Sequence, residues 1–144
     1  MMLGAIRPVK EGEPAGGRSV ILVDDDVTTA EMYRVGLEAF GFSVTVAHDA
    51  EEMFRNIDGQ VPDILVLDWH LPGMHGDEIL HHIRLDERTR ALPVFMLSNY
   101  PGGKDGEIDR VFLAGALAWL EKVKTPPALL AEKLTEALRP APGS

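Results

Sequence analysis

The chain has 144 residues, of which 45% are hydrophobic and 26% charged, so it is long enough for one globular domain and too apolar to be disordered. It contains no cysteine, which excludes disulfide scaffolds, thiolate metal sites and cysteine nucleophiles. The formal net charge of −9, with no run of Lys or Arg, disfavours binding to nucleic acid or to an anionic membrane surface.

Both ends of the chain are expected to lie outside the folded domain. Residues 1–18 contain repeated Pro and Gly without apolar periodicity, which predicts a flexible tail, and residues 139–144 are expected to fray. The N-terminal segment lacks the apolar stretch of a signal peptide, and no part of the chain has the roughly 20 apolar residues that span a bilayer. We therefore expect one domain over residues 19–138, located in the cytoplasm.

Five short apolar runs alternate with amphipathic segments between these ends. The runs cover Ser19–Val23, Ser43–Ala47, Asp63–Leu67, Pro93–Leu97 and Ala116–Leu120. Most of them are continuously apolar, which is typical of strands that are covered on both faces of a sheet.

Helical patterns fill the intervals between the runs. Thr28 and Glu31 fit a capping box at the start of the first helix, and Gly41 is expected to end it. The other predicted helices are Glu51–Ile57, Gly76–Leu85, Asp105–Ala114 and Pro126–Leu138. Right-handed crossovers place such helices on both faces of a parallel sheet. The prediction is an α/β fold: a flavodoxin-like, doubly wound, five-stranded parallel sheet with strand order 2-1-3-4-5 and five helices.

Polar residues at the ends of the predicted strands indicate a site. In this strand order Asp24 and Asp25 converge with Asp68 at the switch point of the sheet, with Ser98 and Lys122 on the far side. Carboxylates this close repel one another unless a cation joins them, and oxygen ligands with room for water suit Mg²⁺. A carboxylate beside a metal ion, a hydroxyl and an ammonium group has the chemistry of a phosphoryl acceptor.

Each of these residues also has an ordinary explanation when taken alone. Asp26 is better explained as a helix N-cap than as a ligand, and an isolated Asp68 as a turn former. A lone Lys122 would be a solvated surface charge. The combination of these residue types at successive strand ends is what favours a functional site.

The sequence resembles the receiver domain of two-component response regulators, as a stand-alone, chemotaxis-regulator-like receiver. The resemblance is carried by four blocks: Val20–Asp26, Ile64–Gly76, Val94–Ser98 and Ala114–Lys122. The most specific part is the segment that runs from Asp68 through Pro72 to Gly76, because Pro and Gly shape the loop after the acceptor. The likeness extends over about residues 19 to 138.

The resemblance implies a role for each site residue. Asp68 would accept a phosphoryl group, Lys122 would pair with it, and Ser98 would bind one of its oxygens and move on activation. The implied ligands of Mg²⁺ are the carboxylates of Asp24, Asp25 and Asp68 and the backbone carbonyl of His70. Trp119 matches the aromatic switch that turns inward when Ser98 moves.

The resemblance also implies partners. The phosphoryl donor would be a sensor histidine kinase or a histidine phosphotransfer protein. A downstream protein would bind the face formed by the fourth helix, fifth strand and fifth helix, and a homodimer is compatible with the same family pattern. The implied chemistry is self-catalysed phosphoryl acceptance and autodephosphorylation, not that of a conventional enzyme.

Three features depart from the family pattern. His70 lies two residues after the acceptor, where its side chain either flanks the path of an attacking water or is an exposed loop histidine. The connection Asn99–Asp105 contains one Pro and two Gly and is expected to be a mobile loop. Val123 replaces the usual proline after Lys122. Since a cis peptide bond before a residue other than proline costs about 2.5–4 kcal/mol, we expect a trans Lys122–Val123 bond and a rerouted loop before Thr125.

Two other functions compete with phosphoryl acceptance. One is a phosphorylation-independent scaffold with the same fold, which the intact acidic set, Ser98 and Lys122 disfavour. The other is an aspartyl-phosphate phosphatase, because Asp24 and Asp26 have the spacing of the two aspartates in haloacid-dehalogenase-like enzymes. A zinc site formed by His75, His81 and His82 is disfavoured because the companion ligands that such sites need are not evident.

Overall fold

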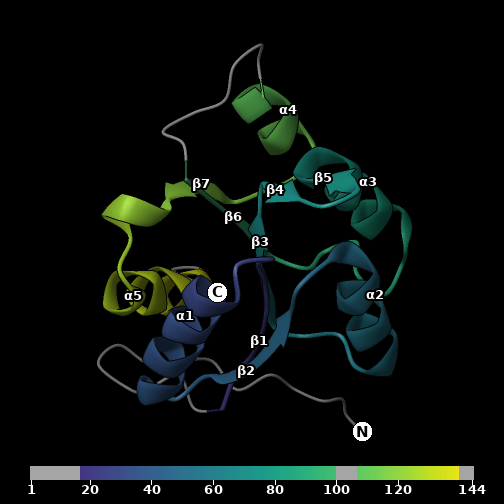
Figure 1. The fold of residues 1–144 in the computed structure, drawn as a ribbon. Coiled ribbons are helices and arrows are strands. Elements are labelled where there is room, and N and C mark those ends of the chain that lie inside the picture. The colour runs from purple at the N-terminus through teal and green to yellow at the C-terminus, as the bar shows by residue number, and fades with distance from the viewer. Residues whose placement is uncertain (1–16, 100–106, 140–144) are drawn as a thin grey trace, which may run out of the picture.

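A five-stranded parallel sheet forms the centre of the molecule in a computed structural model, which describes residues 17–99 and 107–139 (Figure 1). The sheet order is β2-β1-β3-β6-β7. These strands are β1 (Ser19–Val23), β2 (Ser43–Ala47), β3 (Ile64–Asp68), β6 (Val94–Ser98) and β7 (Ala118–Glu121). The predicted order of the five main strands is therefore confirmed. A separate antiparallel pair, β4 (His70–Leu71) and β5 (Met74–His75), follows β3 and was not predicted.

Helices cover both faces of this sheet, as predicted. They are α1 (Val27–Ala39), α2 (Ala50–Gly59), α3 (Gly76–Leu85), α4 (Glu107–Leu113) and α5 (Pro127–Ala137), with a short 3₁₀ helix, η1 (Lys122–Lys124), before α5. Figure 1 shows α1 and α5 together on one side of the sheet and α2 and α3 on the other. No helix within residues 17–99 and 107–139 is long and apolar enough to cross a membrane.

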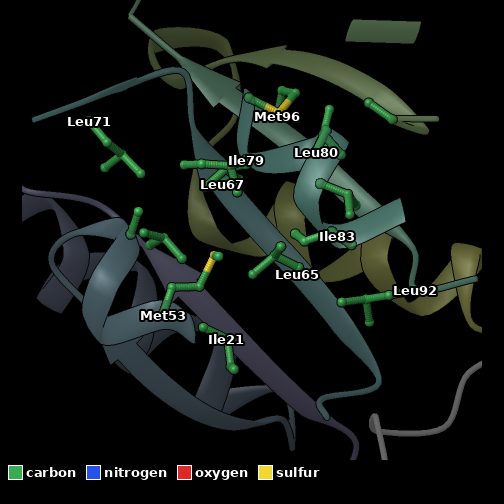
Figure 2. Packing of buried hydrophobic residues seen from close by; sticks show 14 of the residues in the cluster. Ile21, Met53, Leu65, Leu67, Leu71, Ile79, Leu80, Ile83, Leu92 and Met96 are labelled. Atoms are coloured by element: carbon green, nitrogen blue, oxygen red, sulfur yellow. The ribbon is translucent and has the colours of Figure 1, made fainter. Parts of the chain in front are cut away.

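The continuous apolar runs are explained by a core on each side of the sheet. Ile21 and Leu65 face α2 and α3, and Figure 2 shows this cluster. Val20, Leu22 and Val66 face α1 and α5. Successive residues of a strand point to opposite faces, so a strand that is buried on both faces has no polar position along its length.

The predicted capping box of Thr28 and Glu31 is wrong, whereas the interpretation of Asp26 as a helix N-cap is confirmed. Asp26, not Thr28, is the N-cap of α1, and its carboxylate accepts hydrogen bonds from the backbone N–H groups of Thr28 and Thr29 at 3.1 and 3.2 Å. Asp26 has extended backbone geometry, whereas Thr28 already lies inside the helix. Glu31 pairs with Arg34 one turn further along instead of closing a capping box.

Three predicted strands begin one or two residues too early. Asp63 precedes β3 and accepts a hydrogen bond from the backbone N–H of Ser19 at 2.8 Å. Asp68 and Ser98 are therefore the last residues of β3 and β6. Of the proposed N-terminal tail, residues 1–16 lie outside the described part of the chain, as do residues 100–105 of the proposed mobile loop and residues 140–144 at the C-terminus. Arg18 is buried, and its guanidinium lies 4.0 Å from Asp63.

Arg84 connects α3 to both ends of the neighbouring βα segment. Its guanidinium donates to the carbonyl oxygen of Leu92, just before β6, at 2.8 Å and to that of Gly115, just after α4, at 2.8 Å. Gly115 has a φ of +98°, and a Cβ at this position would lie 2.6 Å from Arg84 Nε. Both the left-handed backbone and the close approach therefore require glycine.

The contact between α1 and α5 gives a test of this packing. A Cβ on Gly36 would overlap Pro127, the first residue of α5. We expect Gly36→Ala to lower the free energy of unfolding by about 1–3 kcal/mol, because overpacking outweighs the gain in helix propensity. Gly59→Ala in α2 is the matched control, since no atom lies within 4 Å of the added Cβ. Denaturant unfolding should show a lower free energy of unfolding for Gly36→Ala and an unchanged or higher one for Gly59→Ala. Equal stabilisation by both substitutions would contradict the packing of α1 on Pro127.

Candidate functional site

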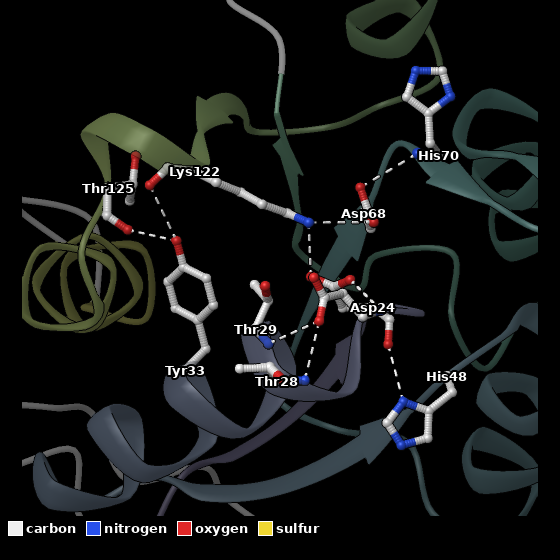
Figure 3. Close-up of polar contacts among 10 residues, drawn as sticks. Asp24, Thr28, Thr29, Tyr33, His48, Asp68, His70, Lys122 and Thr125 are labelled. Carbon is white, nitrogen blue, oxygen red and sulfur yellow. Dashed lines mark hydrogen bonds and ion pairs between the residues drawn. The ribbon is translucent and has the colours of Figure 1, made fainter.

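The carboxyl ends of three strands carry the charged residues of the site. Asp24 follows β1, Asp68 ends β3 and Lys122 follows β7. Because the strands are parallel, these ends meet at one edge of the sheet (Figure 3). They line a cavity of about 350 Å³ together with four other residues. Its lining is Asp24, Asp25, Asp26, Asp68, His70, Asn99 and Lys122.

Lys122 is the cation between two buried carboxylates. Its Nζ lies 2.8 Å from Asp24 Oδ2 and 3.4 Å from Asp68 Oδ2. Asp24 and Asp68 are only 1% and 5% exposed, so the pairing takes place largely out of contact with water. Burial alone would lower the pKa of Lys122, but the hydrogen bond to Asp24 and the charges of both carboxylates outweigh burial and raise it. The ammonium therefore remains charged.

The carboxyl group of Asp68 has a raised pKa. Burial raises its pKa to about 6, and the negative charge of Asp24 acts in the same direction. The Lys122 ammonium and the backbone N–H of His70 oppose this rise; the N–H donates to Asp68 Oδ1 at 3.3 Å. The carboxyl group is thus held in a costly ionised state at neutral pH.

Asp24 is fixed by its own neighbourhood. The backbone N–H of Asp26 donates to Asp24 Oδ1 at 2.9 Å, and the ring Nδ1 of His48 lies 3.0 Å from the Asp24 carbonyl oxygen. Asp24 Oδ1 is held by the turn that begins α1, whereas Oδ2 is directed to Lys122. The side chain is therefore oriented before any ligand binds.

Asp25 completes a group of three carboxylates. One oxygen from each of Asp24, Asp25 and Asp68 lies within 4.8 Å of the others, and the side chain of Asp25 is exposed. Oxygen-only ligands with one solvent-facing member fit a small divalent cation that keeps part of its water shell. Asp26 is not part of this group, because its carboxylate caps α1.

Ser98 and Asn99 lie where β6 ends, beside the site. Ser98 ends β6 and is completely buried, and the cavity is lined at this point by Asn99, which the sequence analysis did not single out. His70 contributes its backbone N–H to Asp68, while its imidazole points away from the carboxylates (Figure 3).

Trp119 lies against a second tryptophan rather than alone. Its ring centroid is 5.2 Å from that of Trp69, with the ring planes tilted by 52°. Trp69 directly follows Asp68 and is buried, whereas Trp119 is half-buried in β7. The two rings connect the residue after the proposed acceptor with the strand that leads to Lys122.

The residues after Lys122 follow the prediction for a chain without proline. The Lys122–Val123 bond is trans, and residues 122–124 form η1. Val123 is 82% exposed, so its side chain supplies no packing to this turn. The histidines at 75, 81 and 82 do not form a group of three metal ligands within the described residues.

Comparison with known proteins agrees with this geometry. The sequence matches the family described as response regulator receiver domain over residues 20–133. It is 32% identical over 127 residues to the phosphate regulon transcriptional regulatory protein PhoB of Pseudomonas aeruginosa, covering 88% of this chain and 55% of that protein. The chain thus spans about half the length of the curated relatives that it matches.

Solved structures give the same result. A putative response regulator from Chloroflexus aurantiacus superposes with a TM-score of 0.76 at 33% identity, covering 85% of this chain and 98% of that one. The chemotaxis response regulator CheY4 of Vibrio cholerae, at 24% identity and a TM-score of 0.76, covers 85% and 99% and supports the fold alone. The chain belongs to the family of response regulator receiver domains of two-component systems.

Proposed function

We propose that this chain accepts a phosphoryl group on Asp68 from a sensor histidine kinase or a histidine phosphotransfer protein, in a Mg²⁺-dependent reaction. The observation that carries the proposal is the position of Lys122 Nζ, 2.8 Å from Asp24 and 3.4 Å from Asp68 among nearly buried carboxylates. A cation placed at a nucleophilic carboxylate is the arrangement that phosphoryl transfer requires.

The reaction follows from the chemistry of Asp68. With a pKa of about 6 the carboxyl group is mostly ionised at neutral pH and is the nucleophile. One of its oxygens attacks the phosphorus of the donor phosphohistidine, the P–N bond breaks, and the leaving imidazole takes up a proton. Lys122 neutralises charge on the transferring oxygens, and Ser98 supplies a hydroxyl donor when it moves toward them. Loss of the phosphoryl group by hydrolysis of the same acyl phosphate is the proposed autodephosphorylation.

The charge balance supports a divalent cation. Three carboxylates and the Lys122 ammonium sum to a formal −2 within the site. We propose Asp24, Asp25 and Asp68 as carboxylate ligands of Mg²⁺, with the backbone carbonyl of His70 as a further one. When bound, the ion supplies positive charge that offsets the negative charge of the transferring group.

The proposed signal leaves through the neighbouring face. Ser98 and Trp119 are the switch residues, and the contact between Trp119 and Trp69 supports communication with Asp68. Phe112, Leu113 and Leu117 expose apolar surface on α4 and just before β7. This supports a face of α4, β7 and α5 that binds a downstream protein or a second copy of the chain. We place this activity in a domain of residues 19–138 and in the cytoplasm.

Two alternatives are weaker. The aspartyl-phosphate phosphatase requires a second aspartate as acid or base, but Asp26 accepts hydrogen bonds from two amides at the start of α1 and caps that helix. A phosphorylation-independent scaffold has no need to maintain the buried charges of Asp24, Asp68 and Lys122, which are costly to bury.

Phosphorylation should occur once, at Asp68. We expect incubation with acetyl phosphate and Mg²⁺ to add the mass of a single phosphoryl group to the intact protein, and Asp68→Asn to show none, because the amide is a poor nucleophile. Asp26→Asn is the control and should react like the wild type. Unchanged phosphorylation of Asp68→Asn would assign the reaction to another residue.

Mg²⁺ should stabilise the fold by relieving repulsion among the three carboxylates. At ten times its dissociation constant, mass action gives about 1.4 kcal/mol. We expect a higher melting temperature in Mg²⁺ than in chelator at matched ionic strength, and no such difference in Asp25→Ala. A magnesium response that persists in full in Asp25→Ala would rule out this ligand set.

Removing the Asp68 charge should stabilise the metal-free protein in a pH-dependent way. The pKa of Asp68 is about 6 in the folded state, against an ordinary value of 3.8, so the folded state binds more protons between these values and the wild type loses stability as the pH rises. We expect the free energy of unfolding of Asp68→Asn to equal that of the wild type near pH 4. Above pH 6.5 it should be higher by roughly 1–2 kcal/mol, the size of such a pKa shift after solvent screening. Urea unfolding of both proteins across this range measures the difference; a difference that is constant with pH contradicts it.

A further inference from the structure

Tyr33 reaches from α1 to the turn that carries Lys122. Its side chain is completely buried, and its hydroxyl lies 2.7 Å from the carbonyl oxygen of Thr125 and 3.4 Å from that of Lys122 (Figure 3). The hydroxyl has one proton, which is donated to the nearer Thr125 oxygen, with the Lys122 oxygen as a longer second acceptor. These two carbonyls belong to the first and last residues of the turn 122–125.

The turn has its other side in solvent. Val123 and Lys124 are exposed, and the backbone N–H of Thr125 donates to the Lys122 carbonyl at 3.1 Å to close the turn. The Lys122–Val123 bond is trans and no proline ring restricts the residue after Lys122. The Tyr33 hydroxyl thus joins both ends of a short 3₁₀ turn to the protein interior.

Two further observations make this contact a rigid one. Gly36, one helical turn after Tyr33, packs directly on Pro127, so α1 contacts the segment 122–127 at two successive levels. Burial and the nearby charge of Asp24 raise the pKa of Tyr33 to about 12, so its hydroxyl is protonated and remains a donor at physiological pH.

We propose that Tyr33 is a positioning residue for Lys122: by holding the carbonyls of Lys122 and Thr125 it fixes the turn from which the Lys122 ammonium reaches Asp24 and Asp68. The catalytic consequence rests on the proposed phosphoryl acceptance at Asp68. The positional consequence does not, because the lysine pairs with both carboxylates without a phosphoryl group.

Tyr33→Phe tests the proposal because it removes only the hydroxyl and leaves the ring in the core. The first readout is reductive methylation of metal-free protein, followed by peptide mass spectrometry. The Lys122 side chain is 10% exposed and Lys124 is 74% exposed in the same chain, so Lys124 is an internal reference. We expect the labelling rate of Lys122 relative to Lys124 to rise severalfold in Tyr33→Phe.

The second readout is the rate of phosphorylation by acetyl phosphate in saturating Mg²⁺. We expect a fall of about tenfold in Tyr33→Phe, since a displacement of about 1 Å at a reacting group costs up to roughly 10²-fold. In a Lys122→Ala background the same substitution should have no further effect, because the residue through which it acts is gone.

Leu37→Val is the control for lost stability. Leu37 is completely buried in the same cluster as Tyr33 and lies one helical turn further along α1. All variants are assayed below their melting temperatures. Under these conditions Leu37→Val should have the labelling ratio and the phosphorylation rate of the wild type.

The outcomes separate the two proposals. A folded Tyr33→Phe with the wild-type labelling ratio and rate overturns the positioning role. A loss of rate that is equally large in the Lys122→Ala background also overturns it, because the effect then bypasses the lysine. A wild type that takes up no phosphoryl group overturns the proposed function, and the labelling ratio still decides whether Tyr33 positions Lys122.

Discussion

The ion cluster of Lys122, Asp24 and Asp68 is the constraint around which the rest of this molecule is arranged. Like charges this close in a nearly buried site are unfavourable, and a single ammonium does not balance them once Asp25 is included. Besides Lys122, the buried carboxylates of Asp24 and Asp68 each accept a hydrogen bond from the backbone of the following turn. Those turns in turn depend on β1 and β3 ending at neighbouring positions in the sheet.

The parallel sheet provides this arrangement at low structural cost. Its five main strands are held by a core on both faces, so the polar residues can be confined to the strand ends. A cavity at the carboxyl ends of the strands removes little apolar packing, because the two hydrophobic clusters pack against the two faces of the sheet. The buried middles of the strands thus stabilise the fold, and their carboxyl ends carry the site, as is usual for open parallel sheets.

The sequence predicts those parts that are encoded by composition and period. Continuous apolar runs identify the five main strands, and the residues after them identify Asp24, Asp68 and Lys122. Both Asp26 and Thr28 are residue types that cap helices, and only the backbone conformation shows that Asp26 is the cap and that the capping box of Thr28 and Glu31 is not formed. The hairpin of β4 and β5 is two residues per strand, too short for any period to be visible.

Contacts between distant elements were the least predictable. Tyr33 lies within the first predicted helix, and nothing in its sequence neighbourhood indicates a partner 92 residues away at Thr125. The place of Asn99 in the cavity lining likewise depends on where β6 ends and the next loop begins, which an apolar run does not determine. The contact between the Trp69 and Trp119 rings likewise depends on which strands are neighbours in space.

The Arg84 guanidinium makes one end of α4 a fixed end. By binding the carbonyls that follow α4 and precede β6, it ties the C-terminus of this helix to α3 and to the base of the sheet. The seven residues of α4 make a rod about 10 Å long. Arg110, in the middle of α4, also pairs with Asp77 of α3 at 3.4 Å, so the helix is held to α3 at more than its last turn. A change in the orientation of α4 therefore has to carry α3 with it or break one of these contacts.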